Sequence, residues 1–381
     1  MTKHLPIGGS TIARTINCPG WIDASKNIVR RKSSDVADLG NLLHDAMEQH
    51  YQNGKTFEQL IAEKLSFKDH VLDVDHLPML YRMQRDVEEV FDRYMVEEYI
   101  CEPFVQLVEG EAGGSIDMLA LSADRKTIVC LDYKTGQNAV NVENNKQLQF
   151  YILCAKVDPK TASMFDEVEN YVSVISQPKV YKDSAAVWEF DNNTLDQFIQ
   201  EVGKAIEQTR QPNAPMSAGS HCMYCPNEPF CAVKQERAAQ ALLLDPENTE
   251  TLDDAVVLAL ELKSWCDRVI ESASDYLESG VVLKNSKMVH GRSTRKWGDT
   301  KAATALLEAE LGDEAYTKKL ISPAQATKKL RGSDIGQQLD TLIVKPEGNP
   351  TLAPMDDPRE AIIFTSAQKK LNKLFDKKVI K

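Results

Sequence analysis

The clearest pattern of apolar runs separated by polar residues lies in residues 113–134, which read GGSIDMLALSADRKTIVCLDYK. Two runs of β-forming residues, Ile116–Leu121 and Thr127–Tyr133, are separated by the polar segment Ser122–Lys126. This arrangement is typical of an antiparallel hairpin. Because most side chains of both runs are apolar, we expect the hairpin to belong to a largely buried sheet.

Three charged side chains interrupt this apolar hairpin. If the chain turns at the Asp124–Arg125 bond, Asp117 faces Asp132, and Lys134 lies on the same side of the sheet. Facing residues have Cβ atoms about 4.5–5.5 Å apart, so two like charges there destabilise a buried sheet. A divalent cation bound by both carboxylates would remove that repulsion, as in a metal-dependent hydrolase. A structural ion pair with Lys134, or a different turn register, explains the same residues without a metal.

Periodic apolar positions predict helices before and after the hairpin, and further β-type runs accompany them. The order of strands, then a crossover helix, then strands predicts an α/β fold with a mixed central sheet flanked by helices. The strand before the hairpin is expected beside it in the same sheet. The predicted helices of this part are residues 10–18, 34–51, 56–65, 77–99, 146–156 and 195–209, and the further strands are residues 102–109, 171–176 and 186–190.

Two of the predicted helices carry polar side chains one turn apart. Gly40 and His44 share one face, where a glycine permits close approach of another element and an imidazole could bind a metal. Gln147 and Tyr151 share one face of the crossover helix, where an amide and a hydroxyl could orient a phosphate or a water. A core or surface histidine and an ordinary polar stripe are the plainer interpretations of the same pairs.

The eight cysteines of the chain include one dense group, Cys222, Cys225 and Cys231, which follows the linker Pro212–Ser220. Three thiolates in this spacing need a fourth ligand to complete a metal or cluster site. Zinc accepts cysteine or histidine, whereas an iron–sulfur cluster strongly prefers cysteine, and the spacing leaves both open. The candidates for the fourth ligand are Cys18, His221, Cys101, Cys130, Cys154 and Cys266.

The 381 residues permit one large domain or two smaller ones, and we divide them into residues 1–235 and a mainly helical region, 236–381. The second region is predicted to contain helices at 252–279, 300–311 and 323–330 and a β-type run at 281–295. It also carries two basic stretches, residues 284–301, with Arg292, Arg295 and Lys296, and the lysine-rich tail 367–381. These are either a nucleic-acid-facing strip or a solvated surface.

The overall net charge is −12, which argues against a surface coated for nucleic acid but not against a local basic channel. No apolar run approaches the ~20 residues of a membrane span, and the first residues do not resemble a signal peptide. We therefore expect a cytoplasmic protein that does not act at a membrane. Eight cysteines in such a compartment favour metal ligands or buried thiols over disulfides.

Taken together, these motifs resemble a known family. The four elements occur in the order Gly40-x3-His44, Gly114-x2-Asp117, Asp132-x-Lys134 and Gln147-x3-Tyr151. This order resembles the PD-(D/E)XK nuclease superfamily and its RecB-like branch, although many members of that branch have Glu where this chain has Asp132. Segments such as Cys18-Pro19-Gly20 also resemble an uncharacterised family often encoded by phages.

The resemblance implies a Mg²⁺- or Mn²⁺-dependent deoxyribonuclease, an exonuclease rather than an endonuclease, that acts in phage-type recombination or DNA processing. His44, Asp117, Asp132 and the main-chain carbonyl of Tyr133 would hold the metal. Lys134 would position or deprotonate the attacking water, and Gln147 and Tyr151 would orient the phosphate backbone. The alternative is a catalytically inactive nucleic-acid-binding or scaffold protein of a recombination or packaging complex.

The same resemblance extends to the cysteines and the partners. In AddB-type recombination nucleases and CRISPR-adaptation nucleases, one upstream and three downstream cysteines bind a 4Fe–4S cluster. This implies that Cys18 joins Cys222, Cys225 and Cys231 around a cluster, with structural zinc as the alternative. The implied partners are DNA and a phage single-strand-binding or annealing protein, in the cytoplasm of a bacterial host if a phage encodes the chain.

Overall fold

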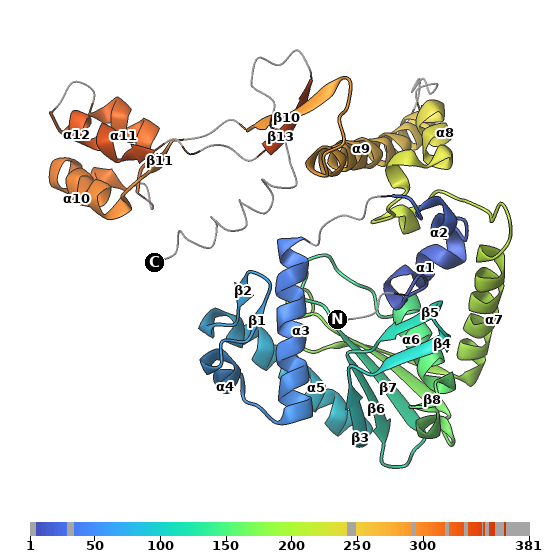
Figure 1. The fold of residues 1–381 in the computed structure, drawn as a ribbon. Helices are drawn as coiled ribbons and strands as arrows, with labels where there is room; N and C mark the ends of the chain where they lie inside the picture. The colour runs from blue at the N-terminus through green and yellow to red at the C-terminus, as the bar shows by residue number, and fades with distance from the viewer. Residues whose placement is uncertain are drawn as a thin grey trace. The chain divides into compact units, whose positions relative to one another are not determined.

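The predicted hairpin lies in the middle of a five-stranded sheet with the strand order β3-β6-β7-β8-β9. Only β7 and β8 are parallel, and the other neighbours are antiparallel, so the sheet is mixed as predicted. Figure 1 shows this sheet in the computed structural model of the protein. The strands are β3 (Val96–Cys101), β6 (Met118–Ser122), β7 (Thr127–Tyr133), β8 (Asn170–Ser176) and β9 (Ala186–Asp191).

The structure describes residues 5–28, 34–241, 249–291, 295–316, 320–330, 334–344, 346, 350–354 and 362. They fall into two compact units, Met1–Leu262 and Lys263–Lys381. The predicted boundary after residue 235 lies within the first unit and stays a prediction. No helix in these described ranges combines the length and apolarity that a membrane crossing requires.

The pairing of β6 with β7 confirms the predicted register. Met118 lies opposite Leu131, and Leu121 lies opposite Ile128, so Asp117 and Asp132 come next at the open end of the pair. Strand β7 has the predicted bounds, whereas β6 begins two residues later than expected. The like-charged residues therefore lie at the end of the ladder, beside the loops, and not inside it.

The crossover from β7 to the parallel strand β8 is made by α6 (Lys146–Val157), close to the predicted helix 146–156. A parallel pair needs such a crossover because its strands run in the same direction. The helix begins where Asn145 caps it, since the Asn145 side chain accepts hydrogen bonds from the backbone N–H groups of Gln147 and Leu148. This cap fixes the start of the helix beside the end of β7.

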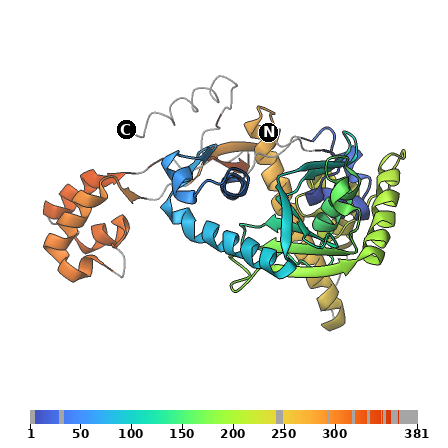
Figure 2. The same ribbon diagram turned by 90° about the horizontal axis from the view of Figure 1, so that it is seen from below.

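Helices cover both faces of the sheet (Figures 1 and 2). Ile128 and Cys130 of β7 belong to one apolar cluster, and Val129 and Leu131 belong to the other. Burial on both faces explains why β7 is a nearly continuous apolar run. One cluster includes side chains of α1 (Gly9–Asn17), α6 and α7 (Asn192–Thr209), and the other includes side chains of α3 (Asp35–Asn53), α4 (Phe57–Ala62) and α5 (Leu77–Tyr94).

Two predictions around residue 100 were wrong. The helix expected over 77–99 ends at Tyr94, where Met95 adopts a left-handed backbone with φ of 48°, and the chain then forms β3. Pairing with β6 determines that strand, and helical periodicity cannot detect such a distant partner. The strand expected at 102–109 is not beside the hairpin in the central sheet. It is β4 (Phe104–Val108), which pairs with β5 (Ala112–Ser115) in a separate two-stranded sheet.

The second unit combines short strands with helices around an apolar cluster that includes Ala303, Leu307 and Leu339. Its helices are α10 (Thr300–Leu311), α11 (Pro323–Lys329) and α12 (Asp334–Leu342), and the first two match the predictions. Its strands form the pairs β10 (Ser286–His290) with β13 (Pro350–Pro354) and β11 (Lys296–Trp297) with β12 (Ile343–Val344).

The other described elements of the chain are α2 (Trp21–Ala24), β1 (Ser66–Phe67), β2 (His70–Val71), α8 (Ala232–Ala241), α9 (Thr249–Glu278) and five short 3-10 helices.

Helix α1 begins against the predicted site residue Tyr151. A Cβ atom placed on Gly9 would lie 2.4 Å from Cζ of Tyr151, and one placed on Gly114 would lie 3.1 Å from Cε1 of the same ring. Both glycines therefore let the backbone lie against the tyrosine ring. Through this contact, α1 supports one wall of the region in which the predicted catalytic residues lie.

We expect Gly9→Ala to destabilise the protein by about 1–3 kcal/mol, because a methyl group 2.4 Å from the Tyr151 ring forces α1 or the ring to move. Gly203→Ala is the matched control: Gly203 lies within α7 with open space around it, so the same change should stabilise by about 0.5–1 kcal/mol. Urea denaturation of the two variants measures both effects. A Gly9→Ala protein as stable as wild type would contradict the close packing.

Candidate active site

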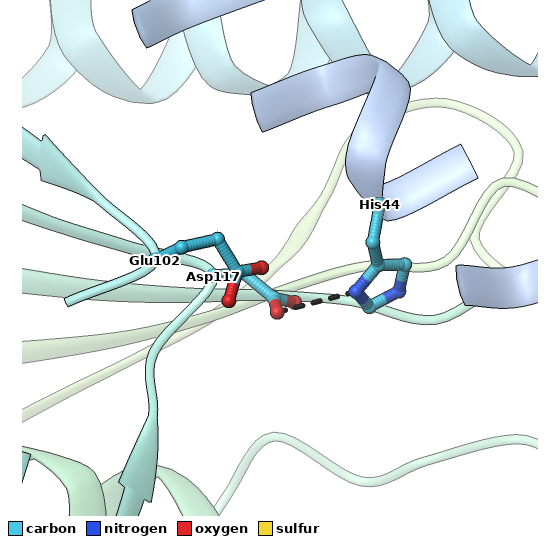
Figure 3. Close-up of side chains that lie close together, drawn as sticks. All are labelled: His44, Glu102 and Asp117. Carbon is cyan, nitrogen blue, oxygen red and sulfur yellow. Dashed lines mark hydrogen bonds and ion pairs between the residues drawn. The ribbon is translucent and has the colours of Figure 1, made fainter. Parts of the chain in front are cut away.

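One end of the central sheet gathers an imidazole and two carboxylates. His44 comes from α3, Glu102 follows β3, and Asp117 precedes β6. Among the described residues, these three alone form a group of at least three potential metal ligands whose ligand atoms lie within 4.8 Å of one another. Nδ1 of His44 lies 3.2 Å from Oδ1 of Asp117, and Figure 3 shows the three side chains close together.

Asp117 is fixed by contacts on both sides. Its Oδ2 accepts a hydrogen bond of 2.6 Å from the backbone N–H of Tyr133, at the end of β7. Its own main-chain carbonyl accepts a hydrogen bond of 3.2 Å from the backbone N–H of Glu102. The end of three strands therefore holds Asp117 in place, with Oδ1 left for His44 or an ion.

Asp132 belongs to a second set of contacts. Its Oδ2 lies 2.7 Å from Nζ of Lys134, and its Oδ1 accepts a 2.8 Å hydrogen bond from Nε2 of Gln147. Lys134 also donates to Oε1 of Gln147 at 3.4 Å. The structure therefore brings together three of the predicted catalytic residues, with Gln147 joining the carboxylate to the ammonium.

The site is buried on the acidic side and open on the basic side. Asp117 and Asp132 expose only 12% and 7% of their side chains, whereas His44 and Lys134 each expose 27%. His44 and Lys134 are therefore more accessible to solvent than Asp117 and Asp132. The carboxylates behind them lie in a region of low dielectric, where opposite charges interact strongly.

Burial and pairing shift the pKa values of these groups. Burial alone would lower the pKa of His44, but the Asp117 carboxylate raises it to about 9. Burial opposes ionisation of Asp117 too, yet His44 and Lys134 hold its pKa below the usual range. Burial raises the pKa of Asp132, against the charge of Lys134. The metal-free site thus depends on two ion pairs, His44 with Asp117 and Lys134 with Asp132.

Glu102 is the residue that the sequence did not identify. It belongs to no spaced motif, and it follows a strand that helical periodicity concealed. Its backbone is left-handed, with φ of 49°, which is uncommon for a residue other than glycine. Burial and the nearby Asp117 charge raise its pKa to about 8. The one available signal was an acidic residue one position before Pro103, at the beginning of a predicted strand.

The glycines and the tyrosine of the spaced motifs have structural roles around this site. A Cβ atom on Gly40 would lie 3.0 Å from Oγ1 of Thr135, so α3 approaches the loop after Lys134 closely, as predicted. Tyr151 lies against Gly9 and Gly114, and burial raises the pKa of its hydroxyl. The side chain of Tyr133 is buried in the cluster that includes α3, which leaves its main chain for the site.

The four cysteines implied by the resemblance line one pocket. Cys18, at the end of α1, lies there with Cys222, Cys225 and Cys231. Backbone N–H groups of Ser217 and Gly219 donate to the sulfurs of Cys18 and Cys222, each at 3.4 Å. His221 also lines this pocket, whereas Cys101, Cys130 and Cys154 lie in the apolar clusters of the sheet or beside them, and Cys266 is exposed.

Two buried cations accompany the cysteines. Arg14, only 8% exposed, donates to the main-chain carbonyls of His221 and Met223 at 3.2 and 2.9 Å. Lys234, 6% exposed, forms an ion pair of 3.8 Å with the buried Glu228. Burial raises the pKa of the Cys222 and Cys225 thiols, and the charges of Lys234 and Arg14 act against that rise.

The predicted DNA-binding residues lie in the second unit. Arg295 and Lys296 are exposed, the latter in β11. Arg292 and the lysines of the tail 367–381 lie outside the described residues. Their role in binding nucleic acid stays a prediction.

Comparison with known proteins shows the family. Residues 4–360 match the family described as "Protein of unknown function (DUF2800)", and the chain belongs to this family. A solved alkaline exonuclease from Laribacter hongkongensis aligns over 52% of this chain and 91% of its own, with 11% identity and a TM-score of 0.23. A solved protein named SSO0001 aligns over 58% and 95%, with 14% identity and a TM-score of 0.22. At these TM-scores, neither likeness carries an argument about this chain.

The His44–Asp117 pair makes a prediction for the chelator-treated protein. We expect the His44 ring to titrate near 9 in wild type and at or below ~6.5 in Asp117→Asn, because burial then lowers its pKa against only the weaker attraction of Asp132. NMR of the His44 ring protons at a series of pH values measures this pKa in wild type and in Asp117→Asn. The pKa of His44 is higher in the folded protein than in the unfolded chain. The stability that the ion pair contributes is therefore fully present below pH ~6.5 and is lost as the pH rises through about 9. A wild-type pKa near 6.5 would contradict the ion pair.

Proposed function

We propose that the protein is a Mg²⁺- or Mn²⁺-dependent deoxyribonuclease of the PD-(D/E)XK type. One observation carries the proposal: the hairpin register brings Asp117, Asp132 and Lys134 to the same end of β6 and β7, with His44 3.2 Å from Asp117. The spaced motifs of the sequence support the same assignment.

The donor set suits a hard divalent cation. Carboxylate oxygens, a main-chain carbonyl and one imidazole are ligands that Mg²⁺ and Mn²⁺ accept, and the site offers no thiolate. His44, Asp117, Asp132 and the carbonyl of Tyr133 would hold the metal. Such an ion polarises a phosphate and makes hydroxide available near neutral pH.

The remaining side chains would act on the substrate directly. Lys134, partly exposed and 2.7 Å from Asp132, would donate to a phosphate oxygen or to the attacking water and offset the charge that develops there. Gln147 is hydrogen-bonded to both the Asp132 carboxylate and the Lys134 ammonium, so it would keep these two groups in their relative positions during hydrolysis. Tyr151, supported by α1, would help to orient the phosphate backbone.

We extend the proposal to the biological setting implied by the motifs. The enzyme would act as an exonuclease in phage-type recombination or DNA processing, with a single-strand-binding or annealing protein as its partner. Arg292, Arg295 and Lys296 would contribute to holding DNA. The alternative, an inactive nucleic-acid-binding or scaffold protein, predicts that no DNA is cut.

We also propose that Cys18, Cys222, Cys225 and Cys231 bind a 4Fe–4S cluster. The four cysteines line one pocket, and the resemblance of the motifs to cluster-binding nucleases supports a cluster. Structural zinc, with His221 as a candidate fourth ligand, is the alternative. The cluster would fasten the end of α1 to the segment around Cys222.

Lys134→Ala should lower the rate of DNA hydrolysis by about 10²–10³-fold, because it removes charge stabilisation in the transition state. Lys126→Ala is the control, since Lys126 is an exposed lysine just before β7 that pairs with Glu169 at 3.0 Å. Digestion of end-labelled single- and double-stranded DNA in the presence of Mn²⁺ measures the rates. If Lys134→Ala cut DNA at the wild-type rate, the site assignment would be wrong, and an inactive wild type would favour the scaffold alternative.

Anaerobically purified protein should be brown, absorb near ~400 nm and contain iron with little zinc. Cys18→Ala should lose the colour and lower the melting temperature as strongly as Cys225→Ala, whereas Cys266→Ala, at an exposed cysteine, should do neither. Metal analysis and thermal melting measure these effects. A colourless protein with one zinc, retained in Cys18→Ala and lost in His221→Ala, would instead show a zinc site of three cysteines and one histidine.

A further inference from the structure

We infer that Glu102 is a ligand of the divalent cation, together with His44 and Asp117. The inference deepens the proposed function, on which it rests, because it adds a carboxylate that the spaced motifs do not contain. It also changes the geometry of the site. The cation would then be held between α3 and the end of β3 as well as between β6 and β7.

The pairing of β3 with β6 places Glu102 beside Asp117. Cys101 lies opposite Met118, so the next residues outward, Glu102 and Asp117, meet at the end of this pair. The 3.2 Å hydrogen bond from the Glu102 N–H to the Asp117 carbonyl fixes their backbones together. Strand pairing, and not a chance meeting of flexible side chains, thus determines the position of the second carboxylate.

The ligand atoms of the three residues converge. One imidazole nitrogen and one oxygen from each carboxylate lie within 4.8 Å of one another, and Figure 3 shows the three side chains close together. Two ionised carboxylates this close repel each other, so a proton or a cation must lie between them. An ion at that position binds two oxygens and a nitrogen, which is a donor set that Mn²⁺ accepts.

Asp132 does not take this place in the metal-free protein. Both of its oxygens are engaged, one by Lys134 at 2.7 Å and one by Gln147 at 2.8 Å. Within the part of the chain that the structure describes, Glu102 forms no ion pair with a lysine or an arginine, and its side chain interacts with Asp117 and His44. Of the two carboxylates that could join Asp117 and His44 at an ion, Glu102 is therefore the one already in position.

The competing explanation is that Glu102 carries a proton and forms a structural hydrogen bond with Asp117. Glu102→Gln separates the two explanations. A glutamine has nearly the same shape and can still donate a hydrogen bond to Asp117, so a structural role survives the change. A role as a metal ligand does not survive, because a neutral amide binds a divalent cation much more weakly than a carboxylate does.

The test is a titration of the chelator-treated full-length chain with Mn²⁺, followed by calorimetry and by EPR of free Mn²⁺. We expect Glu102→Gln to weaken Mn²⁺ binding by at least ~10-fold. Glu98→Gln is the matched control, because Glu98 lies on β3 and is half exposed, 3.6 Å from Arg125. The control removes the same charge and should leave Mn²⁺ binding unchanged.

Thermal melting gives a second measurement that does not depend on catalysis. Without metal, Glu102→Gln should melt close to wild type, which shows that it folds, and saturating Mn²⁺ should raise its melting temperature less than that of wild type. In a double variant with His44→Ala, the losses of affinity should be less than additive, since both residues bind one ion.

The outcomes separate this inference from the proposed function. Wild-type Mn²⁺ affinity in Glu102→Gln would overturn the inference, even if the protein cuts DNA. Weakened Mn²⁺ binding in a protein that cuts no DNA would support the inference and overturn the proposed nuclease activity. A wild-type chain that binds no Mn²⁺ would overturn both.

Discussion

The register between β6 and β7 is the constraint on which the candidate active site depends. Because side chains alternate along a strand, a slip of one residue would move Asp117 away from the end of β7 and exchange the residues that pack into the two apolar clusters. The apolar clusters on both faces of the sheet prevent that slip. The hydrogen bond from the Tyr133 N–H to Asp117 is the last contact of this ladder, and it places the carboxylate.

Charged side chains gather at the same end of the sheet, although the stability of the fold does not require them there. Three carboxylates, one imidazole and one ammonium lie there, and burial shifts the pKa values of Glu102 and Asp132 while the neighbouring charges shift those of His44, Asp117 and Lys134 against burial. A protein selected only for stability would place apolar residues at these positions, since buried ion pairs rarely stabilise more than apolar packing does. This concentration of charge is the reason why we propose that a cation and a phosphate bind here.

Much of this site could be predicted from local sequence signals. The hairpin register followed from a polar turn between two apolar runs, and α6 followed from its apolar periodicity. Glu102 could not be predicted, because its position depends on the pairing of β3 with β6, and residues 95–99 continue a helical pattern. The burial of Tyr151 against Gly9 likewise depends on a contact between residues far apart in the sequence. Local sequence pattern thus predicted the strands and the motifs, whereas the neighbours of each carboxylate could be identified only in the three-dimensional structure.

The central claim is that this end of the sheet binds a divalent cation. Crystals of the full-length chain grown with Mn²⁺ and measured at a wavelength where manganese scatters anomalously would test it directly. The account predicts an anomalous peak in contact with Asp117, His44 and Glu102, within reach of Asp132 and the Tyr133 carbonyl. Crystals that bind Mn²⁺ elsewhere, with no peak at this position and the His44–Asp117 pair still closed, would contradict it.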